Sequence, residues 1–273
     1  MKLALNALVT VKDPDAYGDL RTWPDTQLPG LGRRADIMVW LPPGYDTSDR
    51  AYPVIYMHDA GNLFLPSTSF AGDTWRVGET MTALADEGIS AIVIGIPNHP
   101  TDRLGEYTQY PHPEHGGGHA DKYAEFLVEK LKPAVDAVLR TDPGPGSTIV
   151  AGSSLGAIVS AYLWERFPDV FGAAGLFSTS FWFPGPRALA DFEYAARHPR
   201  ESARIYLDVG GHEGSDLHDA EAQIATSEQA LAILRASDVP VLYVYDSTAQ
   251  HNEAAWARRF PAAMRWLLRD WAA

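Results

Sequence analysis

The chain of 273 residues contains no cysteine, which excludes disulfides, thiolate nucleophiles and zinc–thiolate sites. Basic residues are scarce as well, because 22 Lys and Arg stand against 35 Asp and Glu and give a net charge of −13. No basic run is long enough to follow a phosphate backbone. We therefore expect neither a nucleic-acid partner nor binding to an anionic membrane surface.

Long hydrophobic runs are also missing, since no stretch approaches the roughly 20 apolar residues that a membrane helix needs. Residues 1–9 carry one positive charge and a broken apolar segment, which is too short for a secretory signal peptide. The lack of cysteine leaves the compartment open, because secreted proteins can also lack disulfides. We expect a cytoplasmic protein, with secretion after removal of a leader as the alternative.

The composition is that of an ordinary globular chain, with 46% hydrophobic and 21% charged residues. The sequence has no internal repeat, no low-complexity tract and no Ser- or Gly-rich linker that would separate domains. We therefore expect one domain over residues 1–273. Within it, residues 1–34 are rich in Pro and Gly, and they predict one edge strand and a loop-rich lead-in.

Short apolar runs alternate with stretches of helical periodicity along the rest of the chain. We expect a strand, sharp turn and helix over 148–163, further strands at 35–41, 52–58, 89–96, 173–177, 204–209 and 239–245, and further helices at 77–86, 121–139, 186–197, 220–236 and 254–271. This alternation predicts an α/β fold, a mostly parallel central sheet with helices on both faces and no large separate cap domain. Residues 98–119 are long for a loop, which is typical of a functional or mobile segment.

Residues 152–156, Gly-Ser-Ser-Leu-Gly, match the G-x-S-x-G pattern, in which a sharp turn between strand and helix exposes a serine hydroxyl. A plain strand-to-helix turn is the alternative, because so short a pattern also arises by chance. The β-branched run before the turn and the apolar helix after it favour a nucleophile. The spacing to the two glycines selects Ser154 over Ser153.

A serine nucleophile needs a histidine as base, and the histidine needs a carboxylate that orients it. His251 lies between the last predicted strand and the closing helix, where a base of this architecture belongs. After the strand 204–209, Glu213 is best placed as the acid and Asp216 is the alternative. Asp208 lies inside that strand, so we expect its side chain to point sideways.

The chain order of serine, acid and histidine is that of α/β-hydrolases. The oxyanion that forms on the substrate of such an enzyme needs two backbone N–H donors. We assign one donor to Leu155, at the start of the helix after the turn, and the other to Gly61, with Ala60 as the alternative.

Four segments in this order resemble the putative-esterase family, the esterase D type of α/β-hydrolases: residues 56–64 (YMHDAGNLF), 103–107 (RLGEY), the turn at Ser154, and 251–256 (HNEAAW). The family includes feruloyl and acetyl esterases, siderophore esterases and mycolyltransferases. The similarity runs from about residue 35 to the C-terminus. It implies an α/β-hydrolase fold and places the nucleophile on Ser154, the base on His251 and the acid on Glu213.

The chain departs from the family pattern at two places that bear on the oxyanion site. Ala157 stands where the family often has a second glycine after the turn. Ala60 and Gly61 stand where Gly-Gln often follows the His-Asp pair.

Three aromatic residues, Trp75, Phe181 and Trp182, are candidates for lining an acyl or sugar pocket, with burial in the core as the alternative. Three histidines within residues 112–119 lie in a Gly- and Pro-rich loop without a carboxylate at helical spacing, so we expect no metal site. We also expect no cofactor, because the glycines at 144–146 precede a strand instead of following one.

The sequence thus predicts a serine carboxylic-ester hydrolase that acts through an acyl-enzyme on a small or carbohydrate-linked ester of acetyl or feruloyl type. Acyl transfer to a sugar or alcohol is an alternative, and a non-catalytic binding module on the same fold is another. The expected partner is a small-molecule ester. The sequence leaves open whether the protein forms a homo-oligomer, and which acyl and alcohol groups it takes.

Overall fold

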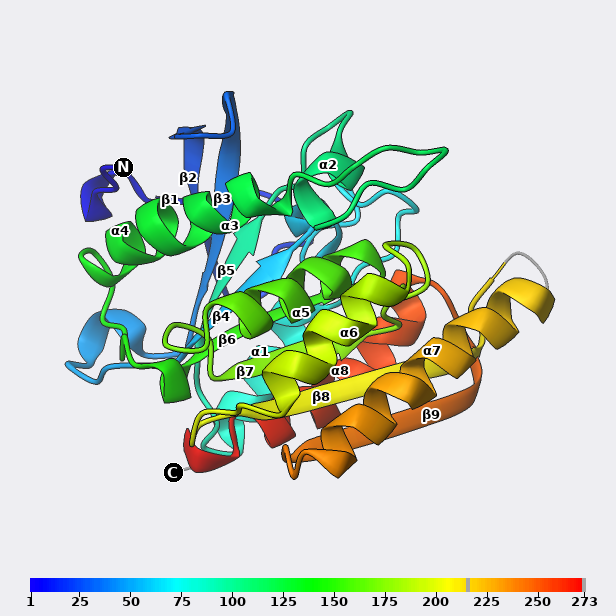
Figure 1. Cartoon of the computed structure of the whole chain (residues 1–273). Coiled ribbons are helices and arrows are strands. Elements are labelled where there is room, and N and C mark those ends of the chain that lie inside the picture. Colours follow the sequence, from blue (N-terminus) through cyan, green and yellow to red (C-terminus); the bar gives the residue numbers. More distant parts are fainter. Residues whose placement is uncertain (215–216, 272–273) are drawn as a thin grey trace.

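The computed structural model describes residues 1–214 and 217–271. Within them a nine-stranded sheet has the order β1-β2-β3-β5-β4-β6-β7-β8-β9 (Figure 1). The strands from β5 to β9 pair in parallel, and β1, β2, β3 and β5 pair antiparallel. Their bounds are β1 Val9–Thr10, β2 Asp19–Leu28, β3 Arg33–Leu41, β4 Val54–His58, β5 Ile92–Ile96, β6 Thr148–Ser153, β7 Ala173–Phe177, β8 Arg204–His212 and β9 Val241–Gln250.

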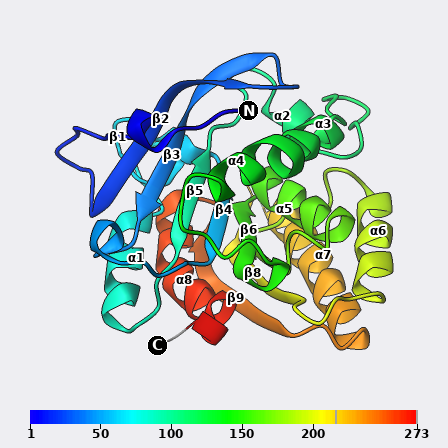
Figure 2. The ribbon, with the colours of Figure 1, turned by 90° about the vertical axis from the view of Figure 1, so that its left-hand side faces the viewer.

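Helices cover both faces of this sheet, which confirms the predicted α/β-hydrolase architecture without a large separate cap in the described residues. Figure 2 shows α1 and α8 on one side and α4 to α7 on the other. A π-helical stretch at Phe126–Leu131 joins α3 to α4. The bounds are α1 Val77–Asp86, α2 Arg103–Tyr107, α3 Ala120–Glu125, α4 Lys132–Asp136, α5 Leu155–Arg166, α6 Pro186–Ala196, α7 Leu217–Ala236 and α8 Glu253–Leu267.

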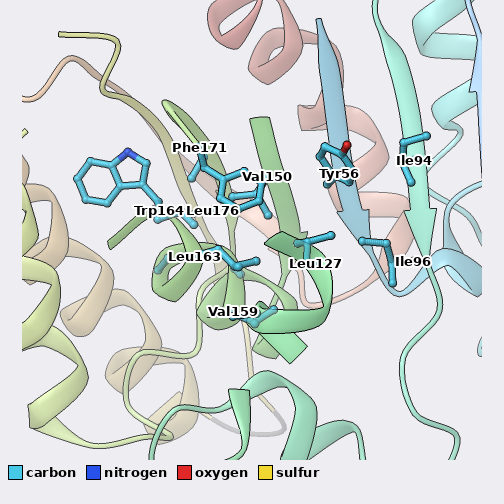
Figure 3. Packing of buried hydrophobic residues seen from close by; sticks show 14 of the residues in the cluster. Tyr56, Ile94, Ile96, Leu127, Val150, Val159, Leu163, Trp164, Phe171 and Leu176 are labelled. Atoms are coloured by element: carbon cyan, nitrogen blue, oxygen red, sulfur yellow. The ribbon is translucent and has the colours of Figure 1, made fainter. Parts of the chain in front are cut away.

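The sheet separates two hydrophobic cores. Successive residues of a strand point to opposite faces, so Tyr56 of β4 belongs to one core and Met57 to the other. The first core joins the sheet to α3 through α7, and Figure 3 shows Val150 and Leu176 from the strands with Leu163 from α5. The second core lies under α1 and α8. Because both faces are covered at the centre of the sheet, β4, β5 and β7 are buried at every residue and are almost entirely apolar. The edge strand β9 is polar in its second half and partly exposed.

The N-terminal region differs from the expected loop-rich lead-in, because the ten residues of β2 form a strand there. The sequence did not predict this strand, because Pro24 lies within it and a proline argues against a strand. Pro24 lies at a register shift between Trp23 and Thr26, beside Asp25 with φ 44°. A bulge on a strand near the sheet edge tolerates a proline that a central strand would not.

None of the helices in the described part of the chain is long and apolar enough to cross a membrane.

Candidate active site

The elbow after β6 holds Ser154 in a constrained backbone conformation. Ser154 is the N-cap of α5, with φ 58° and ψ −120°. Such a positive φ is uncommon for a residue with a side chain and indicates that the backbone is strained at Ser154. A Cβ on Gly152 would lie 2.8 Å from the backbone C and O of Gly156, so no side chain fits there. The two glycines therefore permit the sharp turn.

Two segments beside this turn carry backbone N–H groups that have no hydrogen-bond acceptor within their own helix. Leu155 is the first residue of α5, where an N–H has no intrahelical acceptor. Gly61 lies in a single 3-10 turn, Ala60–Asn62, that follows β4. The two segments pack closely, because a Cβ on Gly156 would lie 3.1 Å from Asp59 Oδ2. Leu155 and Gly61 stay the proposed oxyanion donors, with Ala60 as the alternative.

An ion pair fixes the start of the 3-10 turn. Asp59 has φ 56°, and its carboxylate accepts hydrogen bonds from Arg103 Nε at 2.7 Å and Nη2 at 2.8 Å. Its backbone N–H donates to the Tyr107 hydroxyl at 3.1 Å. Arg103 and Tyr107 belong to the RLGEY segment on α2, whose role the sequence did not reveal. Their contacts indicate that the segment positions the loop that carries Gly61.

The predicted base and acid lie in hydrogen-bond contact. His251 follows β9, Glu213 follows β8, and 2.6 Å separates His251 Nδ1 from Glu213 Oε2. The Glu213 side chain is fully buried, whereas 29% of the His251 side chain is exposed. Asp216, the alternative acid, lies outside the described residues. Asp208 is fully buried in β8, where Tyr206 OH donates to its Oδ2 at 2.8 Å.

The pKa of Glu213 reflects opposing effects. Burial raises the pKa of this carboxyl, but the hydrogen bond to His251 and the charge of that ring lower it. Hydrogen bonds from Ser178 and from the Gly210 N–H lower it further, so that the net pKa lies below the usual range. Glu213 is therefore ionised at neutral pH.

The imidazole of His251 is packed on one side and open on the other. The ring of Trp256 meets it edge-on, with centroids 5.0 Å apart and planes at 82°. A surface hollow of about 500 Å³ opens beside it, lined by His212, Glu213, Gly214, Gln250, His251 and Asn252. A small substrate can therefore approach the ring from solvent.

Two serines that sequence reasoning missed follow β7 and connect the parts of the site. The Ser154 N–H donates to the Phe177 carbonyl at 3.0 Å, and Ser180 Oγ lies 3.3 Å from Ser154 Oγ. Ser178 Oγ donates to Glu213 Oε1 at 2.6 Å. The available signal was topological, because β7 lies between β6, which leads to Ser154, and β8, which leads to Glu213.

The three aromatic candidates lie in different surroundings. Trp75 is 2% exposed and packs its ring against Phe177, with centroids 4.8 Å apart. Phe181 is 1% exposed and also lies in the core. Trp182 is 49% exposed, and its Nε1 donates to Gln223 Oε1 at 2.7 Å. Of the three, Trp182 therefore offers the most surface to a ligand.

The histidine-rich loop packs against an aromatic ring. The ring centroid of His112 lies 4.7 Å from that of His115 and 4.8 Å from that of Phe183, and the His115 and Phe183 centroids lie 6.1 Å apart. Over residues 1–214 and 217–271, no three or more His, Cys, Asp or Glu side chains are grouped so that they could hold a metal ion.

Comparisons with known proteins bear on the family and the fold of this chain. The family described as Putative esterase matches residues 29–267. The uncharacterized protein YbbA of Bacillus subtilis (strain 168) is 23% identical over 239 residues, which cover 84% of this chain and 90% of that protein. An IroE-like serine hydrolase from Shewanella oneidensis has a TM-score of 0.72 at 19% identity and covers 93% of this chain and 81% of its own. The siderophore hydrolase EstA from Aspergillus nidulans has a TM-score of 0.72 at 20% identity, over 95% of this chain and 97% of its own.

Proposed function

The chain belongs to the Putative esterase family, and from this premise we propose that it hydrolyses a carboxylic ester through an acyl-enzyme on Ser154. The observation that carries the proposal is the 2.6 Å contact between His251 and the buried, ionised Glu213, at the sheet edge that holds a strained elbow serine. An ordinary ion pair on the protein surface is the alternative explanation of this contact, but the Glu213 side chain is fully buried.

The contact with Glu213 sets the tautomer of His251. A carboxylate only accepts hydrogen bonds, so the proton of a neutral imidazole resides on Nδ1 and Nε2 is left as the base. His251 Nε2 takes the proton of Ser154 Oγ as that oxygen bonds to the carbonyl carbon of the ester. The resulting imidazolium is stabilised by Glu213.

The remaining steps return the enzyme to its starting state. The tetrahedral intermediate collapses, the bond from carbonyl carbon to alcohol oxygen breaks, and the alcohol leaves with the proton from His251. A water molecule gives a proton to His251 and attacks the carbonyl carbon of the acyl-enzyme. The bond from that carbon to Ser154 Oγ then breaks, Ser154 Oγ takes the proton back from His251, and the carboxylic acid leaves. In acylation and in deacylation the N–H groups of Leu155 and Gly61 stabilise the oxyanion, because these donors have no acceptor within their own helix.

The substrate is an ester small enough to approach Ser154 and His251 from the hollow beside the imidazole ring. Acetyl and feruloyl esters are the first candidates. A siderophore ester joins them, because EstA is described as a siderophore hydrolase. A panel of these esters compared by kcat/KM identifies the class, and a sugar acceptor in the same assay distinguishes hydrolysis from acyl transfer.

The decisive variant is Ser154→Ala. Loss of the nucleophile is expected to lower kcat by about 10⁴-fold or more, and to abolish the mass adduct that a fluorophosphonate leaves on the peptide containing Ser154. Ser153→Ala is the matched control, because Ser153 is the buried neighbour at the end of β6. Full turnover by Ser154→Ala, or an adduct on another serine, would contradict the proposal.

A further inference from the structure

Ser178 occupies a strained and fully buried position behind the proposed acid. It is the first residue after β7, is 0% exposed and has φ 44°. Glycine adopts such a conformation without the steric cost that a Cβ brings. A serine at this place therefore indicates that its hydroxyl compensates for the strain.

The contacts of this hydroxyl determine the direction of its hydrogen. Trp256 Nε1 and Arg259 Nη2 each donate to Ser178 Oγ at 2.9 Å. The indole and the guanidinium have no acceptor atom, so these two bonds use both lone pairs of the hydroxyl oxygen. Its hydrogen is left to point at Glu213 Oε1, 2.6 Å away.

A buried ion pair holds the same serine from its backbone side. The Ser178 N–H donates to Asp208 Oδ1 at 2.9 Å, and Arg259 Nε lies 2.9 Å from Asp208 Oδ2. Both side chains of this pair are almost completely buried. Arg259 thus fixes Ser178 twice, directly at the hydroxyl and through Asp208 at the backbone.

We propose that Ser178 is a positioning residue, whose hydroxyl, directed by Trp256 and Arg259, keeps the Glu213 carboxylate oriented toward His251. The inference rests on the proposed function, because it assigns Glu213 as the acid of the triad. Oε2 of Glu213 faces His251, and Oε1 is held by Ser178 and by the Gly210 N–H. Without Ser178 Oγ, Oε1 of Glu213 keeps only the Gly210 N–H as a hydrogen-bond partner within the residues that the structure describes, and Arg259 loses its link to the acid.

The test is a series of donors of decreasing strength at residue 178. Ser178→Cys keeps a weak S–H donor of similar size, and Ser178→Ala keeps none. Sites are counted by fluorophosphonate titration, so that partial misfolding does not lower the kcat obtained. We expect kcat to fall by about 10- to 100-fold in Ser178→Ala and by less in Ser178→Cys, with KM within about twofold of the wild type.

Thr179→Val is the matched control. Thr179 is the next residue, is equally buried, and its Oγ1 has no hydrogen-bond partner among the described residues. Its replacement removes a buried hydroxyl from the same loop without touching Glu213. We expect kcat per titrated site to stay within about twofold of the wild type.

A double-mutant cycle separates positioning from general damage to the loop. If Ser178 acts through Glu213, then Ser178→Ala changes kcat by less than about twofold when Glu213→Ala is already present. An equal loss in both backgrounds overturns the positioning role, as does a Ser178→Ala enzyme with wild-type kcat per site. If the alanine variant does not fold, the cycle is run with Ser178→Cys under the same criteria. A wild-type protein without ester turnover or a Ser154 adduct overturns the proposed function itself.

Discussion

Two buried polar clusters flank the elbow of Ser154, and they differ in the charge state of a buried titratable side chain. On the β8 side lies the ionised Glu213, and the hydroxyl of Ser178 links it to the Arg259 guanidinium through two hydrogen bonds. On the β4 side lies His58, where burial lowers the pKa of the imidazole to about 3. Its Nδ1 lies 2.9 Å from Tyr123 OH, and its buried Nε2 has no partner among the described residues. His58 is therefore neutral in the folded protein at neutral pH.

The difference follows from the charges that the proposed reaction creates. An imidazolium forms at His251, so a permanent negative charge is useful on the β8 side. An oxyanion forms beside Leu155 and Gly61, where a second uncompensated negative charge would oppose it. Asp59 does lie there, but both of its oxygens are paired with Arg103. The molecule thus places an ionised carboxylate against His251 on one side, whereas on the other side the carboxylate of Asp59 is paired with Arg103.

The largest expected effect tests which of two neighbouring carboxylates serves His251. Glu253 is the first residue of α8, is also buried, and accepts a hydrogen bond from Asn62 Nδ2 at 2.9 Å. Glu213→Gln is expected to lower kcat by about 10³- to 10⁴-fold, because the amide favours the wrong tautomer of the base. Glu253→Gln should lower kcat by less than about tenfold, since it removes no contact with the ring.

Steady-state kinetics on both variants at pH 7 provide the measurement. Asp216→Asn serves as the control, because Asp216 is the alternative acid, and wild-type kinetics are expected for it. A loss in Asp216→Asn that matches the loss in Glu213→Gln would move the acid to residue 216.

The second effect concerns the ion pair on the β4 side. Asp59→Asn keeps the size of the side chain and tolerates the positive φ, but it breaks the charge pair with Arg103. The loop carrying Gly61 then keeps the hydrogen bond from the Asp59 N–H to Tyr107 but loses the charge pair. Because a full oxyanion donor contributes about 10²- to 10³-fold, we expect kcat to fall by about 10- to 100-fold with little change in KM.

The control for this variant is an ion pair remote from the site. Glu87 forms a bidentate pair with Arg265 on exposed side chains. Glu87→Gln should change kcat by less than about twofold, because exposed pairs contribute little. Equal losses in both variants would mean that Asp59 acts on stability and not on the oxyanion loop.

Local patterns were enough to predict the fold. Strand and helix periods, glycine turns and chain order are properties of short segments, so the parallel sheet and the elbow at Ser154 followed from them. His251 and Glu213 also followed, because loops after parallel strands meet at one edge. Two elements were predicted wrongly, because the local sequence pattern differs from the structure that forms there. Pro24 concealed β2, and a π-helical stretch interrupts the helix expected over 121–139.

The residues behind the site could not be read from the sequence, because their roles arise from contacts between distant segments. Ser178 meets Arg259 across 81 positions and Glu213 across 35. Nothing in the serine-rich run at residue 178 distinguishes one hydroxyl from its neighbours. The neutral state of His58 likewise depends on complete burial in the folded chain.

The smallest expected effect tests the neutral charge state on the β4 side through stability. Below pH 6.5 the unfolded chain binds a proton at His58 that the folded chain does not bind until about pH 3. The contribution of His58 to stability is therefore complete above pH 6.5 and is lost as the pH falls, by about 2 kcal/mol between pH 6.5 and 5. In urea unfolding at several pH values, His58→Asn should lose less stability over this interval than the wild type, whatever its stability at pH 7. The exposed His198→Asn should keep the wild-type slope, and an unchanged slope in His58→Asn would show that His58 is protonated in the folded protein.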